Sequence, residues 1–308
     1  MKDPFLLHMF NPTRNVSPFD VNMAYEAGYN DVIPYSGVTL DEIPGLVQDT
    51  IFSRGPKGVK RTGIFIGGRE FGLAVDMLEA AKGAMVPPFE VSVFADPSGA
   101  FTTAAAVIAC VESWVDKKKG VSLEGLNMYV FGGTGPVGLC AGVIAAECGA
   151  NVFLGSRRNA EHVRAIAEPF NKRYGVHMDG ADSRIDDALV LPFRAAHMLN
   201  QAHVIINTAK AGVRVVKASD LKDSKALIVA ADCNAVPPLG IEGVDVNDMG
   251  KILEVTPSKA VGIGALAIGN VKYKVHSKLC QMMIETSKPL YLDFQDAFKV
   301  AREYAREA

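Results

Sequence analysis

Six residues near the middle of the chain have the spacing of a phosphate-binding loop. They directly follow the apolar run 127–131 and read Gly133, Thr134, Gly135, Pro136, Val137 and Gly138. A Gly-x-Gly-x-x-Gly turn between a strand and a helix lets the backbone approach a pyrophosphate, and it directs the free amides of the helix N-terminus at the negative charge. The chemistry that this spacing predicts is the binding of a dinucleotide.

The turn after the next expected strand, 150–155, indicates which dinucleotide is bound. In a strand-helix-strand unit of this kind, an acidic residue at that place binds the ribose hydroxyls of NAD and repels the 2′-phosphate of NADP. This chain has no carboxylate between Glu147 and Glu161. It offers a hydroxyl and two guanidinium groups, which suit a phosphate: Ser156, Arg157 and Arg158. The sequence therefore predicts NADP as the preferred cofactor and NAD as a weaker one.

Two later apolar runs, 203–209 and 226–231, are typical of buried parallel strands. Ligands bind at the carboxyl ends of such strands, so the residues at those ends are further candidates for the cofactor site. They are Asn207, Thr208, Ala209, Asp232 and Asn234. The same residue types also form ordinary turns, and the pattern leaves both roles open.

Composition excludes several other classes of function. A net charge of -2 over 308 residues gives no electrostatic reason to expect nucleic acid or an anionic membrane as a partner. The five cysteines have no Cys-x-x-Cys spacing, and the six histidines have no metal-ligand spacing, so we expect reduced core thiols and no metal site. Because no long apolar stretch is free of charges or breakers, we expect no membrane span and a cytoplasmic location.

The elements that must position these residues alternate between strand and helix along the whole chain. Strands are expected at 6–10, 31–35, 63–67 and 90–95, with helices between them. The predicted class is α/β, with two α/β domains, of which the second is a Rossmann-type domain with a parallel sheet. We assign 1–104 plus 285–308 to a substrate domain and 105–284 to the NADP-binding domain. Helices are also expected over 271–286 and from 291 onward.

Four separated segments carry a resemblance to a known family. They are 17–21 (SPFDV), 96–106 (DPSGAFTTAAA), 234–241 (NAVPPLGI) and 262–272 (GIGALAIGNVK). Together they closely resemble the bacterial NAD(P)-dependent methylene-tetrahydromethanopterin dehydrogenases, over nearly the whole chain. The resemblance implies oxidation of the methylene bridge of a reduced pterin to the methenyl form, in the one-carbon pathway that oxidises formaldehyde. It also implies a tetrahydromethanopterin-type carrier as substrate and a homo-oligomer.

The implied reaction needs no general base. A carbon between two amine nitrogens can lose hydride directly, because the product is a delocalised amidinium cation. Catalysis then depends on holding that carbon about 3 to 3.5 Å from the nicotinamide carbon. The resemblance places Lys272 beside the substrate, where we expect it to orient a polar group of the pterin. Asp20 and Asp96 are candidates to stabilise the developing positive charge.

Two other functions stay open. A shikimate-dehydrogenase-like NADP-dependent alcohol oxidoreductase has the same order of domains, and a non-catalytic NADP(H) sensor is compatible with the same fold. None of the eight tyrosines is followed four residues later by lysine, which argues against cyclohydrolase activity and against a short-chain dehydrogenase. The sequence does not distinguish tetrahydromethanopterin from its dephospho form or from tetrahydrofolate.

Overall fold

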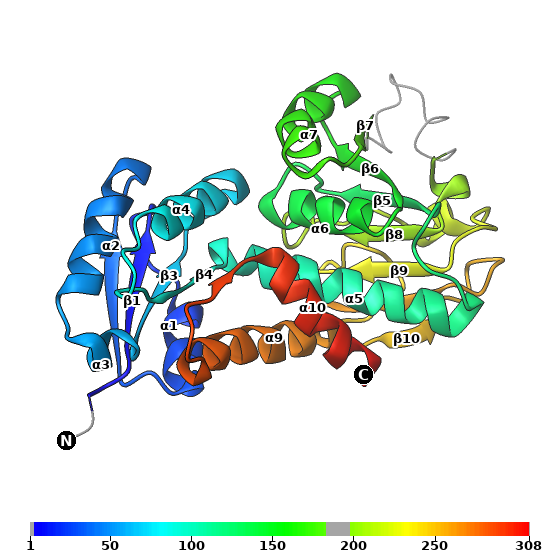
Figure 1. The fold of residues 1–308 in the computed structure, drawn as a ribbon. Helices are drawn as coiled ribbons and strands as arrows, with labels where there is room; N and C mark the ends of the chain where they lie inside the picture. Colours follow the sequence, from blue (N-terminus) through cyan, green and yellow to red (C-terminus); the bar gives the residue numbers. More distant parts are fainter. Residues whose placement is uncertain (1–2, 183–197, 308) are drawn as a thin grey trace. The chain divides into compact units, whose positions relative to one another are not determined.

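The computed structural model describes residues 3–182 and 198–307, and strands alternate with helices along it (Figure 1). The chain forms two compact units. The first comprises Met1–Thr102 and Tyr273–Val300, and the second comprises Thr103–Lys272 and Ala301–Ala308. The predicted α/β class is confirmed. The ligand domains 1–104 plus 285–308 and 105–284 stay a prediction, and they include residues 1–2, 183–197 and 308, which lie outside the described part.

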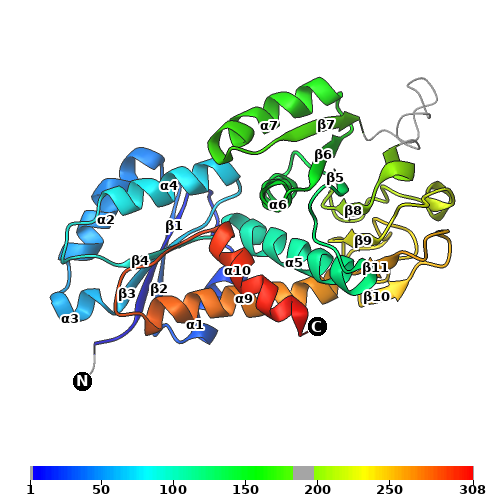
Figure 2. The ribbon, with the colours of Figure 1, turned by 45° about the vertical axis from the view of Figure 1, so that its right-hand side comes forward.

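The first unit is built on a parallel sheet of five strands in the order β12-β4-β3-β1-β2. Its strands are β1 (Leu6–Asn11), β2 (Asp31–Ser36), β3 (Thr62–Ile66), β4 (Ser92–Ala95) and β12 (Tyr291–Leu292). Its helices before the second unit are α1 (Pro18–Ala27), α2 (Ile43–Phe52), α3 (Pro56–Val59) and α4 (Phe71–Gly83). Helices α2 and α4 lie side by side, and α4 packs on β3 and β4 (Figure 2).

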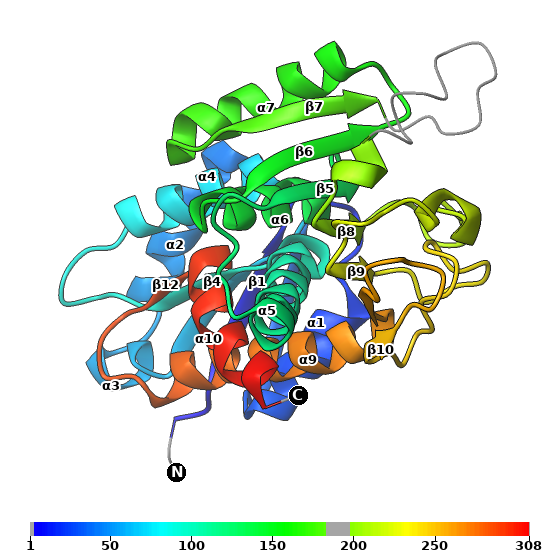
Figure 3. The same ribbon diagram turned by 90° about the vertical axis from the view of Figure 1, so that its right-hand side faces the viewer.

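The second unit contains a sheet of seven strands in the order β10-β11-β9-β8-β5-β6-β7. The strands are β5 (Asn127–Phe131), β6 (Asn151–Ser156), β7 (Met178–Asp182), β8 (Val204–Asn207), β9 (Val229–Asp232), β10 (Met249–Ile252) and β11 (Val261–Ile263). The predicted parallel sheet is confirmed, with one addition: the edge strand β10 is antiparallel to β11. The strands succeed one another from β7 through β6, β5 and β8 to β9 in Figure 3.

The strand order fixes where a ligand can bind in the second unit. The chain runs from β5 outward to β6 and β7, and then returns to the other side of β5 with β8. Ligands bind at such a reversal because the loops leave two neighbouring strands in opposite directions there. Helices α6 (Pro136–Glu147) and α7 (Ala160–Tyr174) cover β5, β6 and β7.

Three further long helices lie in the described part of the chain, and two of them begin at a different residue from the one predicted. They are α5 (Ala100–Lys119), α9 (Ala265–Glu285) and α10 (Phe294–Arg306). Helix α9 begins earlier than the predicted residue 271, at the point where Gly264 approaches the backbone so closely that a Cβ would lie 1.9 Å from Asp245 O. Helix α10 begins later than the predicted residue 291, because Tyr291 and Leu292 pair with β4 instead.

Among the described residues, one segment, Pro97–Lys119, is long and apolar enough by length and composition to cross a membrane. It consists of α5 and the turn before it. In this protein 72% of the most apolar 18-residue stretch of this segment is buried inside the fold. A core helix has the same composition as a membrane span, so packing accounts for these apolar residues.

Candidate functional site

The predicted phosphate loop lies at the strand reversal, between β5 and α6. Gly132, with φ +72°, turns the chain out of β5, and Gly133 N donates to Gly155 O at 3.0 Å. Gly135 is the N-cap of α6, and Pro136 opens the helix. The first amides of a helix have no partner within it, so this loop presents hydrogen-bond donors at the reversal.

The glycines of the loop serve different purposes. A Cβ at Gly133 would lie 2.8 Å from Leu154 Cβ, and one at Gly138 would lie 2.6 Å from Gly132 O. The packing of the protein itself therefore requires both. At Gly135 the contact is milder, since a Cβ would meet Gly132 O at 3.3 Å. Among the three glycines, Gly135 is therefore the one least crowded by the protein, and its contact with a pyrophosphate stays a prediction.

Two of the predicted residues after β8 lie beside this loop. Thr208 donates from its backbone N and from Oγ1 to Phe131 O, both at 2.9 Å. Ala209 comes so close to Gly132 that a Cβ on that glycine would lie 2.6 Å from Ala209 N. Sequence analysis missed Gly132, although its place directly before the triplet was a signal. Thr208 and Ala209 are thus held against the start of the phosphate loop.

The polar residues at the end of β9 and just after it form hydrogen bonds within the protein. Asp232 Oδ1 accepts from Asn207 Nδ2 at 2.8 Å and from Asn234 N at 2.9 Å, while Oδ2 accepts from Ile241 N at 2.9 Å. Asn234 Oδ1 accepts from Gly212 N at 3.1 Å. Asn207, Asp232 and Asn234 are all buried. These bonds order the loops at the carboxyl edge of the sheet, and direct contact with a cofactor stays a prediction for Asp232 and Asn234.

The predicted phosphate-binding turn stands at the end of β6. Ser156 is the last residue of the strand, and its Oγ accepts from Arg158 N at 3.3 Å. Both Arg157 and Arg158 are exposed. The Arg158 Nη1 lies 3.1 Å from Nε2 of His162 in the first turn of α7. The hydroxyl and both guanidinium groups are therefore gathered on one exposed turn.

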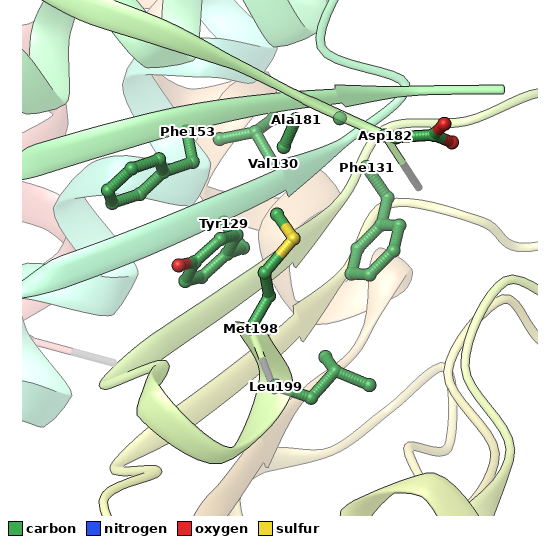
Figure 4. A pocket seen from close by; sticks show the side chains of 9 residues that line it. Tyr129, Val130, Phe131, Phe153, Ala181, Asp182, Met198 and Leu199 are labelled. Atoms are coloured by element: carbon green, nitrogen blue, oxygen red, sulfur yellow. The ribbon is translucent and has the colours of Figure 1, made fainter. Parts of the chain in front are cut away.

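A carboxylate that sequence analysis did not find stands beside this turn. Asp182 ends β7 and is the register partner of Ser156 in β6. Figure 4 shows its carboxylate directed away from the stacked rings of Tyr129 and Phe153, whose centroids are 4.7 Å apart. The strand Met178–Asp182 contains Gly180 and two acidic residues, so its sequence has little of a strand pattern. The aromatic cavity of about 20 Å³ in Figure 4 is too small for a nucleotide ring.

The first unit contains a larger cavity of about 320 Å³ at the carboxyl ends of β1 and β3. Polar and apolar groups both line it, and the polar residues include Asn11, Ser17, Asp20, Arg69 and Ser98; we refer to it as the polar cavity. Helix α1 begins directly at this cavity, because Ser17 accepts from Asp20 N at 3.4 Å and Pro18 occupies the first turn. Asp20 is thereby brought into the wall, with 3% of its surface exposed.

Two other residues shape this cavity. Asn11 Nδ2 donates to Asn15 O at 2.7 Å and to Thr13 Oγ1 at 2.8 Å, which folds the loop after β1 around the opening. Ser98 has a φ of +53°, and its Oγ donates to Gly68 O at 2.7 Å. All three contacts lie between residues of the wall. The cavity is therefore a built feature of the first unit.

The remaining candidates, Asp96 and Lys272, are not in the lining of this cavity. Asp96 is fully buried, and its Oδ1 accepts from Phe101 N at 2.9 Å and from Thr102 N at 3.2 Å at the start of α5. His276, which sequence analysis missed, places Nδ1 3.1 Å from Asp96 Oδ2. Nothing in the sequence distinguished this lone histidine from other helix residues. Lys272 is half-buried on α9 in the second unit.

Comparison with known proteins places the chain among enzymes. The Pyrococcus furiosus ornithine carbamoyltransferase structure has a TM-score of 0.54 at 14% identity, covering 93% of this chain and 87% of that one, and it shares the fold alone. Residues 18–98 match the family model of "Methylene-tetrahydromethanopterin dehydrogenase, N-terminal".

Two curated relatives come from Methylorubrum extorquens. The bifunctional protein MdtA is 34% identical over 97% of this chain and 99% of its own length. The NAD(P)-dependent methylenetetrahydromethanopterin dehydrogenase is 45% identical over 97% of this chain and 98% of its own length. This identity over almost the full length of both chains confirms the resemblance seen in the sequence. The chain belongs to the family of NAD(P)-dependent methylenetetrahydromethanopterin dehydrogenases.

Proposed function

We propose that this protein oxidises methylene-tetrahydromethanopterin, or a close tetrahydropterin, to the methenyl form by direct hydride transfer to NADP, in one-carbon metabolism. The observation that carries the proposal is the 45% identity over 97% of the chain to a dehydrogenase of that name. The phosphate loop at the strand reversal and the polar cavity of the first unit supply a place for each ligand.

The geometry of the second unit supports the proposed cofactor contacts. The pyrophosphate would lie against Gly135, where the backbone is open, and on the amides of Thr134, Val137 and Gly138. Thr208 and Ala209 would border the loop on the β8 side. The 2′-phosphate would be held by Ser156, Arg157 and Arg158. NADP, when bound, supplies the carbon that accepts the hydride.

Absorbance spectra distinguish the proposed reaction from its alternatives. Mixing the protein with methylene-tetrahydromethanopterin and NADP should produce the NADPH band and a methenyl band together. An alcohol oxidoreductase would produce the NADPH band alone, and only with an alcohol. A sensor would bind NADP and produce neither. Comparing the methylene forms of tetrahydromethanopterin, its dephospho form and tetrahydrofolate identifies the carrier.

Asp20→Asn should lower kcat about tenfold, which corresponds to about 1.4 kcal/mol of lost transition-state stabilisation. The buried carboxylate in the cavity wall favours the positive charge that forms on the pterin, and the amide has the same shape without the charge. Steady-state kinetics measures the effect. Asp49→Asn, on the exposed face of α2, makes the same substitution away from the cavity and should leave kcat unchanged. Equal rates for the Asp20 variant and the wild type would remove Asp20 from the catalytic group.

Lys272→Ala should lower the rate at saturating substrate but leave turnover measurable, and kcat should stay nearly flat with pH. Hydride transfer to NADP releases a cation and needs no proton carrier. We expect a loss below about a hundredfold, since removal of an essential acid or base costs about 10² to 10⁴-fold. Lys274→Ala, two residues along α9 and exposed, is the control. A bell-shaped kcat profile that loses one limb in the Lys272 variant would show that this residue moves a proton.

A homo-oligomer and a cytoplasmic location are further parts of the proposal. The tetrahydropterin carrier and the pyridine nucleotide are small polar molecules, and the net charge of -2 favours neither nucleic acid nor an anionic membrane surface. Light scattering behind a size-exclusion column gives the number of subunits.

A further inference from the structure

A buried histidine in the first unit has one ring nitrogen without a partner. His276 has no exposed surface, and its Nδ1 lies 3.1 Å from Asp96 Oδ2. Its Nε2 is buried too, and it has no hydrogen-bond partner among residues 3–182 and 198–307. A buried polar atom of this kind lowers stability and is uncommon in proteins. The loss of stability that the unpaired Nε2 causes suggests that the rest of the His276 ring has a structural or functional role.

The surroundings of the ring are aromatic. His276 packs against Phe19 at 5.7 Å, Phe65 at 5.8 Å and Phe94 at 5.3 Å between ring centroids. Because a carboxylate oxygen accepts, we assign a hydrogen to Nδ1, which donates to Asp96 Oδ2. The ring thus joins one carboxylate to a cluster of three phenylalanines.

We propose that His276 is a positioning residue that holds two walls of the polar cavity. The proposal rests on the proposed function, in which this cavity takes the pterin. The first wall is Phe65, which lines the cavity and packs against the ring of His276. The second wall is Ser98, which also lines the cavity and follows Asp96 by two residues. In this role His276 contacts neither the methylene carbon of the pterin nor the nicotinamide carbon. It acts through Phe65 and Asp96.

The second wall depends on Asp96 because the turn that follows it adopts an unusual backbone. Ser98 has a φ of +53°, a backbone conformation that residues other than glycine rarely adopt. Asp96 holds the start of this turn by accepting from Phe101 N and from Thr102 Oγ1, the latter at 2.6 Å. The bond from His276 anchors the same carboxylate from α9. The start of the turn is therefore held from α9 by His276 and from α5 by Phe101 and Thr102.

Two substitutions separate the two functions of the ring. His276→Phe keeps an aromatic ring beside Phe65 and removes the donor to Asp96. His276→Asn keeps a donor near the position of Nδ1 and removes the ring. Because each retains one wall, we expect both variants to raise the KM for methylene-tetrahydromethanopterin by about fivefold, which is less than one tenfold step in binding. We expect kcat to change less than KM.

The dissociation constant of NADP, measured by calorimetry, should not change in either variant, because the phosphate loop belongs to the second unit. His177→Phe, at an exposed site in the second unit, is the matched control. A double-mutant cycle with Asp96→Asn tests the bond itself, since His276→Phe should then raise KM less than it does in the wild type. An unchanged KM in both folded variants would overturn the proposal, as would an equal loss of NADP affinity.

A second measurement needs no substrate. Amide hydrogen exchange should quicken in peptides that cover 65–69 and 96–101 in the two variants, relative to the wild type, while peptides of β5 and α6 stay unchanged. If the variants show this pattern but the wild type shows no turnover with the pterin, the proposed function fails and the positioning role of His276 stands. Unchanged exchange in both segments would show that His276 holds neither wall. A variant that does not fold is replaced by the other one in both measurements.

Discussion

Gly135→Val loses NADP binding while the protein keeps its fold. The new side chain would occupy the space where a pyrophosphate approaches the N-terminus of α6. Within the described part of the chain, a Cβ at Gly135 meets Gly132 O at 3.3 Å, which is a mild contact. We expect the affinity for NADP to fall by more than about a hundredfold, or about 2.8 kcal/mol. Calorimetry measures the binding, and the melting temperature together with circular dichroism reports the fold.

Two control variants make this result specific. Gly45→Val adds the same side chain on α2. A Cβ at Gly45 would have no atom of another part of the described chain within 4 Å, so this variant should leave NADP binding intact. Gly138→Val should instead lower stability, because a Cβ there would lie 2.6 Å from Gly132 O and 2.7 Å from Gly133 Cα. Tight NADP binding by a folded Gly135 variant would mean that the pyrophosphate lies elsewhere.

Arg157→Ala and Arg158→Ala together reduce the preference for NADP over NAD by about ten- to a hundredfold in kcat/KM, since an ionic hydrogen bond to a phosphate contributes about 1.5 to 3 kcal/mol. Both side chains are exposed on the turn after β6, where they lack the constraint of packing. The single variants show which arginine carries the effect. An unchanged ratio in the double variant would rule out this turn as the 2′-phosphate site.

Asp182→Asn should change the preference for NADP over NAD in the opposite direction. Its carboxylate ends the strand beside Ser156 and would repel a 2′-phosphate bound there. Removing the charge should therefore raise the preference for NADP. A fall in the affinity for both cofactors would instead show that Asp182 contacts a part that they share.

The phosphate loop could be predicted because its function and its backbone geometry demand the same residues. Packing requires Gly133 and Gly138, and the proposed approach of a pyrophosphate requires Gly135, so the spacing is visible in the sequence. Asp20 became a candidate by another route, because its segment is part of the family resemblance; the structure places it in a cavity wall, and its catalytic role stays a prediction. Local patterns of this kind survive without knowledge of the fold.

Residues that act through partners distant in the sequence could not be found. His276 lies 180 positions from Asp96, and no helix pattern indicates that bond. Asp182 became relevant only through the strand order, which places β7 beside β6. The antiparallel edge strand β10 was missed for a similar reason, because its four residues pair only with β11. The start of α9 depends on a backbone approach at Gly264 that no local propensity records.

The interleaving of the two units along the chain limits how genes of this family can recombine. The units change at 102/103, 272/273 and 300/301, so each consists of two stretches of sequence. A chimera that takes its cofactor unit from a relative needs three junctions, and each falls inside a helix or at its start. A gene fragment that ends after α4 and β4 would also lack β12, leaving β4 as an open edge. If the turn after β6 holds the 2′-phosphate as proposed, point substitution there changes the cofactor preference without any of these junctions.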